Sequence, residues 1–311
     1  MKVAFLFPGQ GSQSVGMMDA WAEHAGVQAV LQQGNHALGE DLTGLIAHGP
    51  ADALNLTTNT QPAMLLCSVA MYRAWQQAGG LTPALVAGHS LGEYSALVAA
   101  DTLDLADAVR TVRVRAQAMQ SAVPVGQGGM AAILGLDDEA VRQVCAQASG
   151  DQMIVEAVNY NAPAQVVIAG HVAAVEKACE LAKAAGAKRA LSLPVSAPFH
   201  SRLLQPAAQV LQDTLAAIEI HTPNIPLINN VDVAMPADPV AIRDALVRQA
   251  WHPVRWVETI QSMKQQGITH LVECGPGKVL SGLVKRIDRD LVAYNITDPA
   301  SLQQTLDALG A

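Results

Sequence analysis

Ser90 is the residue with the clearest capacity for chemistry, because it lies at the centre of the sequence Gly88-His89-Ser90-Leu91-Gly92. The apolar residues 85–87 predict a strand before it, and residues 91–100 predict a helix after it. Enzymes of the α/β class place a serine nucleophile in this GxSxG pattern, because its glycines permit the tight turn that exposes the hydroxyl. A purely structural strand-to-helix turn is the alternative interpretation. The pattern alone does not separate a hydrolase from a transferase.

Two main-chain amides are candidates for an oxyanion hole, which stabilises negative charge on a reacting carbonyl oxygen. The amide of Leu91 follows the serine and is expected to point at that charge, at a helix start that carries Glu93 in its first turn. The loop over residues 7–13 follows the first predicted strand, so Gln10 can supply a second amide. A phosphate site is the weaker interpretation of this loop, because it has no GxGxxG pattern and no Walker lysine. The turn over residues 275–278 is interpreted as structural.

A serine hydroxyl needs a general base within hydrogen-bond reach, and the chain has 9 histidines. His89 is adjacent to the serine, but neighbouring side chains in a sharp turn point apart, so we expect His89 to pack against the scaffold. His200 is the preferred candidate, because it lies in a loop just after residues 126–195, and catalytic groups collect in such loops. A surface histidine is the alternative. Four other histidines fit equally well on spacing alone: His171, His221, His252 and His270.

Arg115 interrupts an apolar stripe on a predicted helix. Four positions spaced i, i+4, i+7 and i+11 share one face of the helix expected over residues 107–121: Ala108, Val112, Arg115 and Met119. Arg110 and Arg113 lie elsewhere on this helix and are interpreted as solvated charges. A guanidinium turned inward needs an anionic partner to offset its desolvation. The partner is either an internal Asp or Glu, or a substrate carboxylate held by the two-pronged guanidinium.

Apolar strands alternate with amphipathic helical segments over most of the chain, which predicts a parallel sheet covered by helices. The predicted strands of this sheet are Val3 to Phe7, Leu85 to Gly88, Leu227 to Asn229 and His270 to Glu273.

Residues 126–195 follow the order strand-helix-strand-strand-helix-strand, which is that of the ferredoxin-like unit. The predicted strands are Met130 to Leu134, Ile154 to Asn159, Val166 to Ala169 and Arg189 to Pro194, and the predicted helices are Asp137 to Ala148 and Val172 to Ala185. Because the earlier alternation resumes afterwards, we predict a small domain over residues 126–195, inserted into a large catalytic α/β domain made of residues 1–125 and 196–311.

Composition narrows the class of protein. Of the 311 residues, 50% are hydrophobic, which is enough for a substantial core. A net charge of -8 without a long run of Lys or Arg argues against nucleic acid or a membrane as partner. The apolar run at residues 3–7 is too short for a signal-peptide core. The 4 cysteines include no CxxC pair and have no histidine at metal-ligand spacing, so we expect a reduced, cytoplasmic protein without a metal or cofactor.

Taken together, these motifs resemble the malonyl-CoA:acyl carrier protein transacylases of bacterial type II fatty acid synthesis, from end to end. The matching segments are residues 7–13, 88–96 (GHSLGEYSA), 112–119, 158–161, 193–200, 229–233, 247–249 and 273–282. The family's fold is an α/β-hydrolase-like large domain with a parallel sheet, carrying a ferredoxin-like small domain. The resemblance implies ping-pong transfer of malonyl from malonyl-CoA, through a serine ester, to the phosphopantetheine thiol of acyl carrier protein.

The resemblance also implies a role for each catalytic position. Ser90 matches the nucleophile and His200 matches the base. This family orients the base with a main-chain carbonyl near the position of Gln249, so the lack of an evident aspartate does not count against catalysis. Gln10 and Leu91 match the oxyanion-hole amides.

The acyl pocket is implied by four further positions. Arg115 matches the arginine that binds the malonyl carboxylate, and Gln249 and Asn159 match supporting pocket residues. Phe199 is bulkier than the residue that many bacterial members carry before the histidine. We expect it to exclude a methylmalonyl branch by steric contact, although one methyl group contributes only about 1 to 3 kcal/mol of discrimination.

Docking of the acidic carrier protein and coenzyme A requires local positive charge, because this chain is net negative. The candidate basic rim around the site consists of Lys188, Arg189, Lys278, Lys285 and Arg286. Scattered solubilising charge is the alternative interpretation.

Other functions remain as alternatives at this stage. A serine hydrolase with the same turn would release malonate to water, and a carrier-binding scaffold would perform no chemistry. Within the transferase class, the enzyme could instead act in trans for a polyketide synthase or for malonate decarboxylase.

Overall fold

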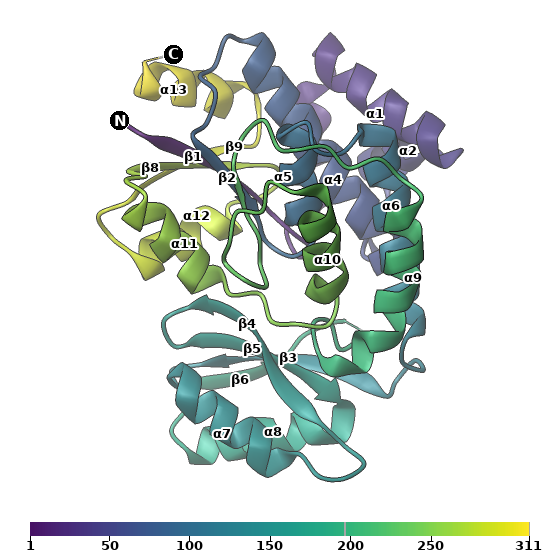
Figure 1. The fold of residues 1–311 in the computed structure, drawn as a ribbon, viewed down its shortest axis with the longest axis vertical. Helices are drawn as coiled ribbons and strands as arrows, with labels where there is room; N and C mark the ends of the chain where they lie inside the picture. The colour runs from purple at the N-terminus through teal and green to yellow at the C-terminus, as the bar shows by residue number, and fades with distance from the viewer. Residues whose placement is uncertain (196, 311) are drawn as a thin grey trace.

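The chain contains a parallel sheet and a separate antiparallel sheet, each covered by helices (Figure 1). The structure is a computed structural model and describes residues 1–195 and 197–310. The predicted boundary at Ser196 and the chain end at Ala311 lie outside the described residues. Among the described residues, no helix is long and apolar enough to cross a membrane.

The first sheet has five parallel strands in the order β7-β2-β1-β8-β9. Their bounds are β1 Val3–Phe7, β2 Leu85–Gly88, β7 Leu227–Ile228, β8 His270–Cys274 and β9 Val292–Ile296. The first four confirm the predicted strands to within one residue, and β9 was not predicted. In the central strand β1, Val3, Phe5 and Phe7 enter one core cluster, and Ala4 and Leu6 enter another. Both faces of the strand are apolar because helices cover both sides of the sheet.

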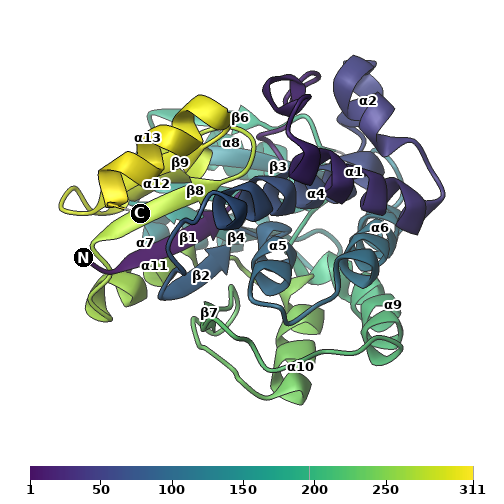
Figure 2. The same ribbon diagram turned by 90° about the horizontal axis from the view of Figure 1, so that it is seen from above.

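Eleven α-helices within the described residues belong to the body around this sheet. They are α1 Ala25–Leu38, α2 Leu42–His48, α3 Ala51–Leu54, α4 Thr57–Gln77, α5 Gly92–Ala99, α6 Leu105–Ser121, α9 Gln205–Ala216, α10 Pro239–Gln249, α11 Trp256–Gln265, α12 Val279–Ile287 and α13 Pro299–Leu309. Helices α1, α4, α6 and α9 gather on one side of the strands (Figure 2). Helices α11 and α12 pack against the other face of the strands in the second core cluster, so the sheet lies between two helical layers.

Helix α6 begins at an Asp104 cap, whose carboxylate accepts a hydrogen bond from the Ala106 amide at 2.8 Å. The helix therefore starts two residues before the predicted position. Its predicted inward stripe, Arg115 included, is buried as expected. The helix packs between α4 and α9, which brings the arginine toward the carboxyl end of strand β2.

The second sheet has four antiparallel strands in the order β4-β5-β3-β6. Its elements are β3 Gly128–Leu134, α7 Asp138–Ala148, β4 Val155–Ala162, β5 Gln165–His171, α8 Val172–Ala184 and β6 Arg189–Ser192, in the predicted order. It lies below the five-stranded sheet in Figure 1. Helices α7 and α8 cover one face, and Met130, Val158 and Val167 on the other face join the main core. Met130 of β3 and Asn159 of β4 thereby line the pocket that contains Ser90.

Candidate active site

Ser90 occupies a strained turn between β2 and α5. Its φ of 52° lies in the left-handed region that side chains other than glycine rarely adopt. The two flanking glycines are required by crowding. A Cβ on Gly88 would lie 1.8 Å from the main-chain carbon of Gly92, and one on Gly92 would lie 2.0 Å from the carbonyl oxygen of Phe7. The physical reason given for the GxSxG pattern therefore holds in this chain.

His200 is placed as a base for Ser90. Its Nε2 lies 2.6 Å from Ser90 Oγ, and its Nδ1 lies 2.8 Å from the main-chain carbonyl oxygen of Gln249. A carbonyl oxygen only accepts hydrogen bonds, so Nδ1 carries the proton and Nε2 is free to accept one from the serine. Burial, followed by the charge of Arg115, lowers the pKa of His200 to about 3. The imidazole is therefore neutral at physiological pH.

The other histidines lie in different positions. His89 hydrogen-bonds Asn161 at 2.7 Å and packs edge-on against Trp256, which confirms the expected contact with the scaffold. It also forms part of the pocket wall beside the serine. Four alternative histidines do not line this pocket in the described part of the chain: His171, His221, His252 and His270.

Arg115 presents a buried positive charge to the serine. The side chain is 1% exposed, and its Nη2 donates hydrogen bonds to Ser90 Oγ at 3.2 Å and to Gln249 Oε1 at 2.8 Å. Its Nη1 donates to Gln61 Oε1 at 2.7 Å, and the guanidinium lies over the ring of Tyr94. Burial lowers the pKa of Arg115, but guanidinium remains charged at neutral pH.

Arg115 makes no direct ion pair in the described chain. The buried Glu93 favours its charged form from the other side of Gln249, which hydrogen-bonds both residues. Among the described residues, no Asp or Glu carboxylate lies within salt-bridge distance of Arg115. Its acceptors are neutral amides and a hydroxyl, which leave the charge available for an anion in the pocket.

Gln10 and Leu91 line the same pocket as Ser90, which has a volume of about 120 Å³. Within the described chain, neither main-chain amide donates a hydrogen bond. The side chain of Gln10 is tied to Thr57 by a hydrogen bond of 3.1 Å, which fixes the loop after β1. Two unpaired amides beside a nucleophilic serine form the arrangement that an oxyanion hole requires.

Gln249 connects the three polar groups of the site. Its carbonyl oxygen accepts from His200, its Oε1 accepts from Arg115, and its Nε2 donates to Ser90 O at 2.9 Å and to Glu93 Oε2 at 3.0 Å. The residue is fully buried at the end of α10. One side chain and its own carbonyl thereby orient both the base and the arginine.

Two predicted pocket residues complete the wall. Phe199 and Asn159 both line the pocket, and the buried Asn159 Oδ1 has no hydrogen-bond partner among the described residues. Sequence reasoning missed Gln61, the second acceptor for Arg115. The available signal was a glutamine directly before the largely apolar run of residues 62–72 in helix α4.

The five basic residues do not form one ring around the serine. Lys188, Arg189 and Arg286 line a shared surface pocket between β3 and α12, away from the pocket of Ser90. Lys278 precedes α12, and Lys285 lies in its last turn. All five are exposed. They follow α12 toward the small sheet and do not line the acyl pocket.

A serine at a strained strand-to-helix turn, a histidine held by a carbonyl and two unpaired amides form an arrangement typical of serine-dependent acyl transfer. The chain belongs to the acyl transferase domain family, whose model matches residues 4–295.

Named relatives narrow this class. The chain is 53% identical over 98% of both chains to the malonyl CoA-acyl carrier protein transacylase of Escherichia coli K12. It is similar to the solved acyl-carrier-protein S-malonyltransferase of Burkholderia pseudomallei, with 64% identity, a TM-score of 0.97 and coverage of 99% of this chain and 100% of that one. Another solved relative, with 48% identity, a TM-score of 0.97 and coverage of 99% and 100%, is a malonyl-transacylase in complex with a type II PKS acyl-carrier protein.

Proposed function

We propose that this chain transfers the malonyl group from malonyl-CoA to the phosphopantetheine thiol of acyl carrier protein, for fatty acid biosynthesis. One observation carries the proposal. Arg115 is a buried cation without a carboxylate partner among the described residues, and its Nη2 lies 3.2 Å from the nucleophilic oxygen of Ser90. Malonyl is a short acyl group with a free carboxylate, which a guanidinium binds through charged hydrogen bonds.

Acylation of Ser90 is the first half of the reaction. His200 Nε2 accepts the hydroxyl proton as Ser90 Oγ attacks the thioester carbonyl carbon. The amides of Gln10 and Leu91 stabilise the negative oxygen of the tetrahedral intermediate. The carbon–sulfur bond then breaks, and coenzyme A leaves as a thiol with the proton from His200. The product is a malonyl-Ser90 ester.

Transfer to the carrier protein is the reverse chemistry with a different thiol. His200 takes the proton of the phosphopantetheine thiol, and the sulfur attacks the ester carbonyl in the same oxyanion hole. The carbon–oxygen bond breaks and the proton returns to Ser90 Oγ. One base serves both halves because its neutral form is regenerated after each.

Selectivity for malonyl over larger acyl groups is assigned to the pocket wall. Phe199 occupies space that a methyl branch would need, and the unpartnered Asn159 Oδ1 offers one polar contact inside the wall. Steric exclusion of one methyl group contributes about 1 to 3 kcal/mol of discrimination.

Carrier docking is assigned to the exposed basic residues along α12 and the adjoining end of the small sheet, where Lys188, Arg189 and Arg286 share a surface pocket. An acidic carrier is attracted to this surface even though the whole chain is negative, because the attraction is local.

For the fold, we propose an α/β-hydrolase-like large domain made of residues 1–125 and 196–311, and an inserted ferredoxin-like domain over residues 126–195. The support is the parallel order β7-β2-β1-β8-β9 beside the antiparallel order β4-β5-β3-β6. We further propose that catalysis needs no metal or cofactor, because the residues above account for every proton transfer. Four free cysteines favour a reducing cytoplasm.

The proposal is tested by following free coenzyme A and free malonate with and without carrier protein. Malonyl transfer predicts release of coenzyme A that depends on the carrier, with little malonate. A serine hydrolase would release malonate at the same rate in both conditions, and a scaffold would release neither.

A polyketide carrier is the second candidate acceptor, because one solved relative is a malonyl-transacylase bound to a type II PKS acyl-carrier protein. Comparing kcat/KM for the carrier of each pathway decides between them.

A further inference from the structure

The backbone of Ser90 needs an external support. At a φ of 52° the serine lies in a region that its side chain disfavours, and such conformations persist only where the surroundings hold them. The glycines on either side permit the turn but make no side-chain contact that would hold it.

Asn230 supplies that support through its carboxamide. Its Nδ2 donates to the carbonyl oxygen of Gly88 at 2.7 Å, and its Oδ1 accepts from the amide of Ser90 at 2.7 Å. The two bonds join the end of β2 to the nucleophile across the turn. Asn230 is fully buried and does not line the acyl pocket, so its contacts serve the protein and not a substrate.

The main chain of Asn230 is itself fixed on both sides. Its amide donates to Glu93 Oε2 at 3.0 Å, and its carbonyl oxygen accepts from the amide of Arg255 at 3.2 Å. The same Glu93 oxygen accepts from Gln249 Nε2 at 3.0 Å. Asn230, which supports the nucleophile, and Gln249, which orients the base, therefore both donate to Oε2 of Glu93.

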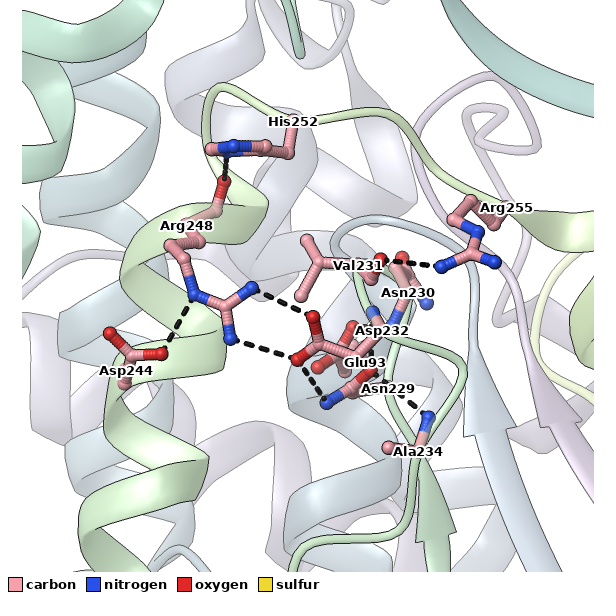
Figure 3. Close-up of polar contacts among 10 residues, drawn as sticks. All are labelled: Glu93, Asn229, Asn230, Val231, Asp232, Ala234, Asp244, Arg248, His252 and Arg255. Atoms are coloured by element: carbon pink, nitrogen blue, oxygen red, sulfur yellow. Dashed lines mark hydrogen bonds and ion pairs between the residues drawn. The ribbon is translucent and has the colours of Figure 1, made fainter.

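The loop that carries Asn230 is folded by its own contacts (Figure 3). Asn229 Oδ1 accepts from the amide of Asp232 at 2.9 Å, and Arg248 binds the Asp232 carboxylate with two nitrogens at 2.9 and 2.8 Å. Val233, a β-branched residue, has a φ of 55° in this loop. A loop with this conformation is held in place by many contacts, which gives Asn230 a rigid base.

We propose that Asn230 is a positioning residue that holds the Ser90 turn in its reactive geometry. Without its carboxamide the turn relaxes, so Ser90 Oγ leaves His200 Nε2 and the adjacent Leu91 amide rotates with it. The inference deepens the proposed function and rests on Ser90 being the acylated residue. It does not depend on malonyl being the natural acyl group.

The test measures acylation of Ser90 by malonyl-CoA and by p-nitrophenyl acetate in Asn230→Ala. Misplacement of a nucleophile by about 1 Å costs on the order of 100-fold in rate. We expect both acylation rates to fall by about that factor, with little change in KM for malonyl-CoA. Unchanged rates, or a loss confined to malonyl, would overturn the proposal.

Asn229→Ala is the matched control, because it removes a buried amide of the same loop that contacts neither Gly88 nor Ser90. We expect a similar loss of thermal stability but acylation within a few-fold of wild type. If Asn229→Ala slows acylation as much as Asn230→Ala, loop integrity explains the effect and the assignment of Asn230 fails.

Asn230→Asp keeps the shape of the side chain and makes its hydrogen bond to Gly88 depend on pH. The protonated acid donates to the Gly88 carbonyl as the amide does, whereas the carboxylate repels it. We therefore expect its acylation rate, relative to wild type, to rise as the pH is lowered, and a constant ratio would contradict the proposal. A wild type that reacts with p-nitrophenyl acetate but not malonyl-CoA would instead refute the proposed function alone.

Discussion

Arg115 Nη2 donates a hydrogen bond to Ser90 Oγ at 3.2 Å, although the arginine lies on helix α6 and the serine in a turn 25 positions earlier. The contact places a fixed positive charge beside the atom that is expected to carry the acyl group. A carboxylate on that acyl group would meet the guanidinium without any movement of the main chain.

Replacing Arg115 by Ala should cost malonyl transfer far more than acetyl transfer, because only malonyl presents a free carboxylate. Each lost hydrogen bond to a charged group corresponds to about 1.5 to 3 kcal/mol, or roughly tenfold to a hundredfold in kcat/KM. Arg110→Ala is the control, since Arg110 lies on the same helix and pairs with Asp107 in solvent. Equal losses for the two acyl donors would contradict the assigned role.

The pH dependence of acylation should reflect the lowered pKa of His200. Protonation of Nε2 removes the base, so the rate falls as the pH drops through that pKa. With the pKa lowered to about 3 by burial and then by Arg115, the fall lies well below the ordinary histidine value of 6.5. The measurement is the single-turnover rate of Ser90 acylation from acid to neutral pH.

Arg115→Ala gives this pH profile an internal check. Removing the guanidinium charge raises the pKa of His200, so the acid limb of acetyl transfer should move to higher pH. If the acid side of the pH–rate profile does not move in Arg115→Ala, the charge of Arg115 does not lower the pKa of His200. If the wild-type rate already falls near pH 6.5, burial does not lower that pKa either.

Glu93 predicts a pH-dependent contribution to stability. Burial raises its pKa from 4.5 to about 7, so the folded state holds a proton that the unfolded state has already released. The free energy of unfolding of wild type relative to Glu93→Gln is therefore highest below pH 4.5 and declines as the pH rises to about 7, by at most about 3 kcal/mol. Urea unfolding of both proteins across this range measures the difference.

Glu139→Gln is the control for this pH dependence of the free energy of unfolding. Arg142 lowers the pKa of the exposed Glu139, so its contribution is lost as the pH falls and has the opposite sign. A Glu93→Gln variant with the same pH dependence as wild type would mean that Glu93 remains ionised in the folded protein.

Phe199→Ala should reduce selectivity against methylmalonyl-CoA. The phenyl ring forms part of the acyl pocket wall, and its removal opens space for the methyl branch. The ratio of kcat/KM for malonyl-CoA to that for methylmalonyl-CoA should fall by roughly tenfold or more, which matches about 1 to 3 kcal/mol. An unchanged ratio would place the discriminating contact elsewhere.

Local features of the sequence were sufficient to predict the turn that carries Ser90. The Ser90 turn is encoded by adjacent residues, because its strand, its glycines and its helix are contiguous in the chain. The inward stripe of α6 was also predictable, since helical periodicity alone places Arg115 with its apolar neighbours.

Contacts between residues far apart in the sequence could not be predicted in the same way. His200 meets Ser90 across 110 positions, and spacing alone did not separate it from four other histidines. Gln61 and Asn230 were not assigned roles, because a polar residue in a helix or loop gives no sign of which distant group it will contact. Strand β9 was missed because three of its five residues are half-buried, so its pattern lacks the continuous apolar run of β1.

Mass spectrometry of the intact protein mixed with malonyl-CoA directly detects a malonyl ester on Ser90. We expect a malonyl adduct in wild type that is located on Ser90 after proteolysis, is absent in Ser90→Ala and disappears when acyl carrier protein is added. No adduct in wild type, or an adduct that persists in Ser90→Ala, would contradict this expectation.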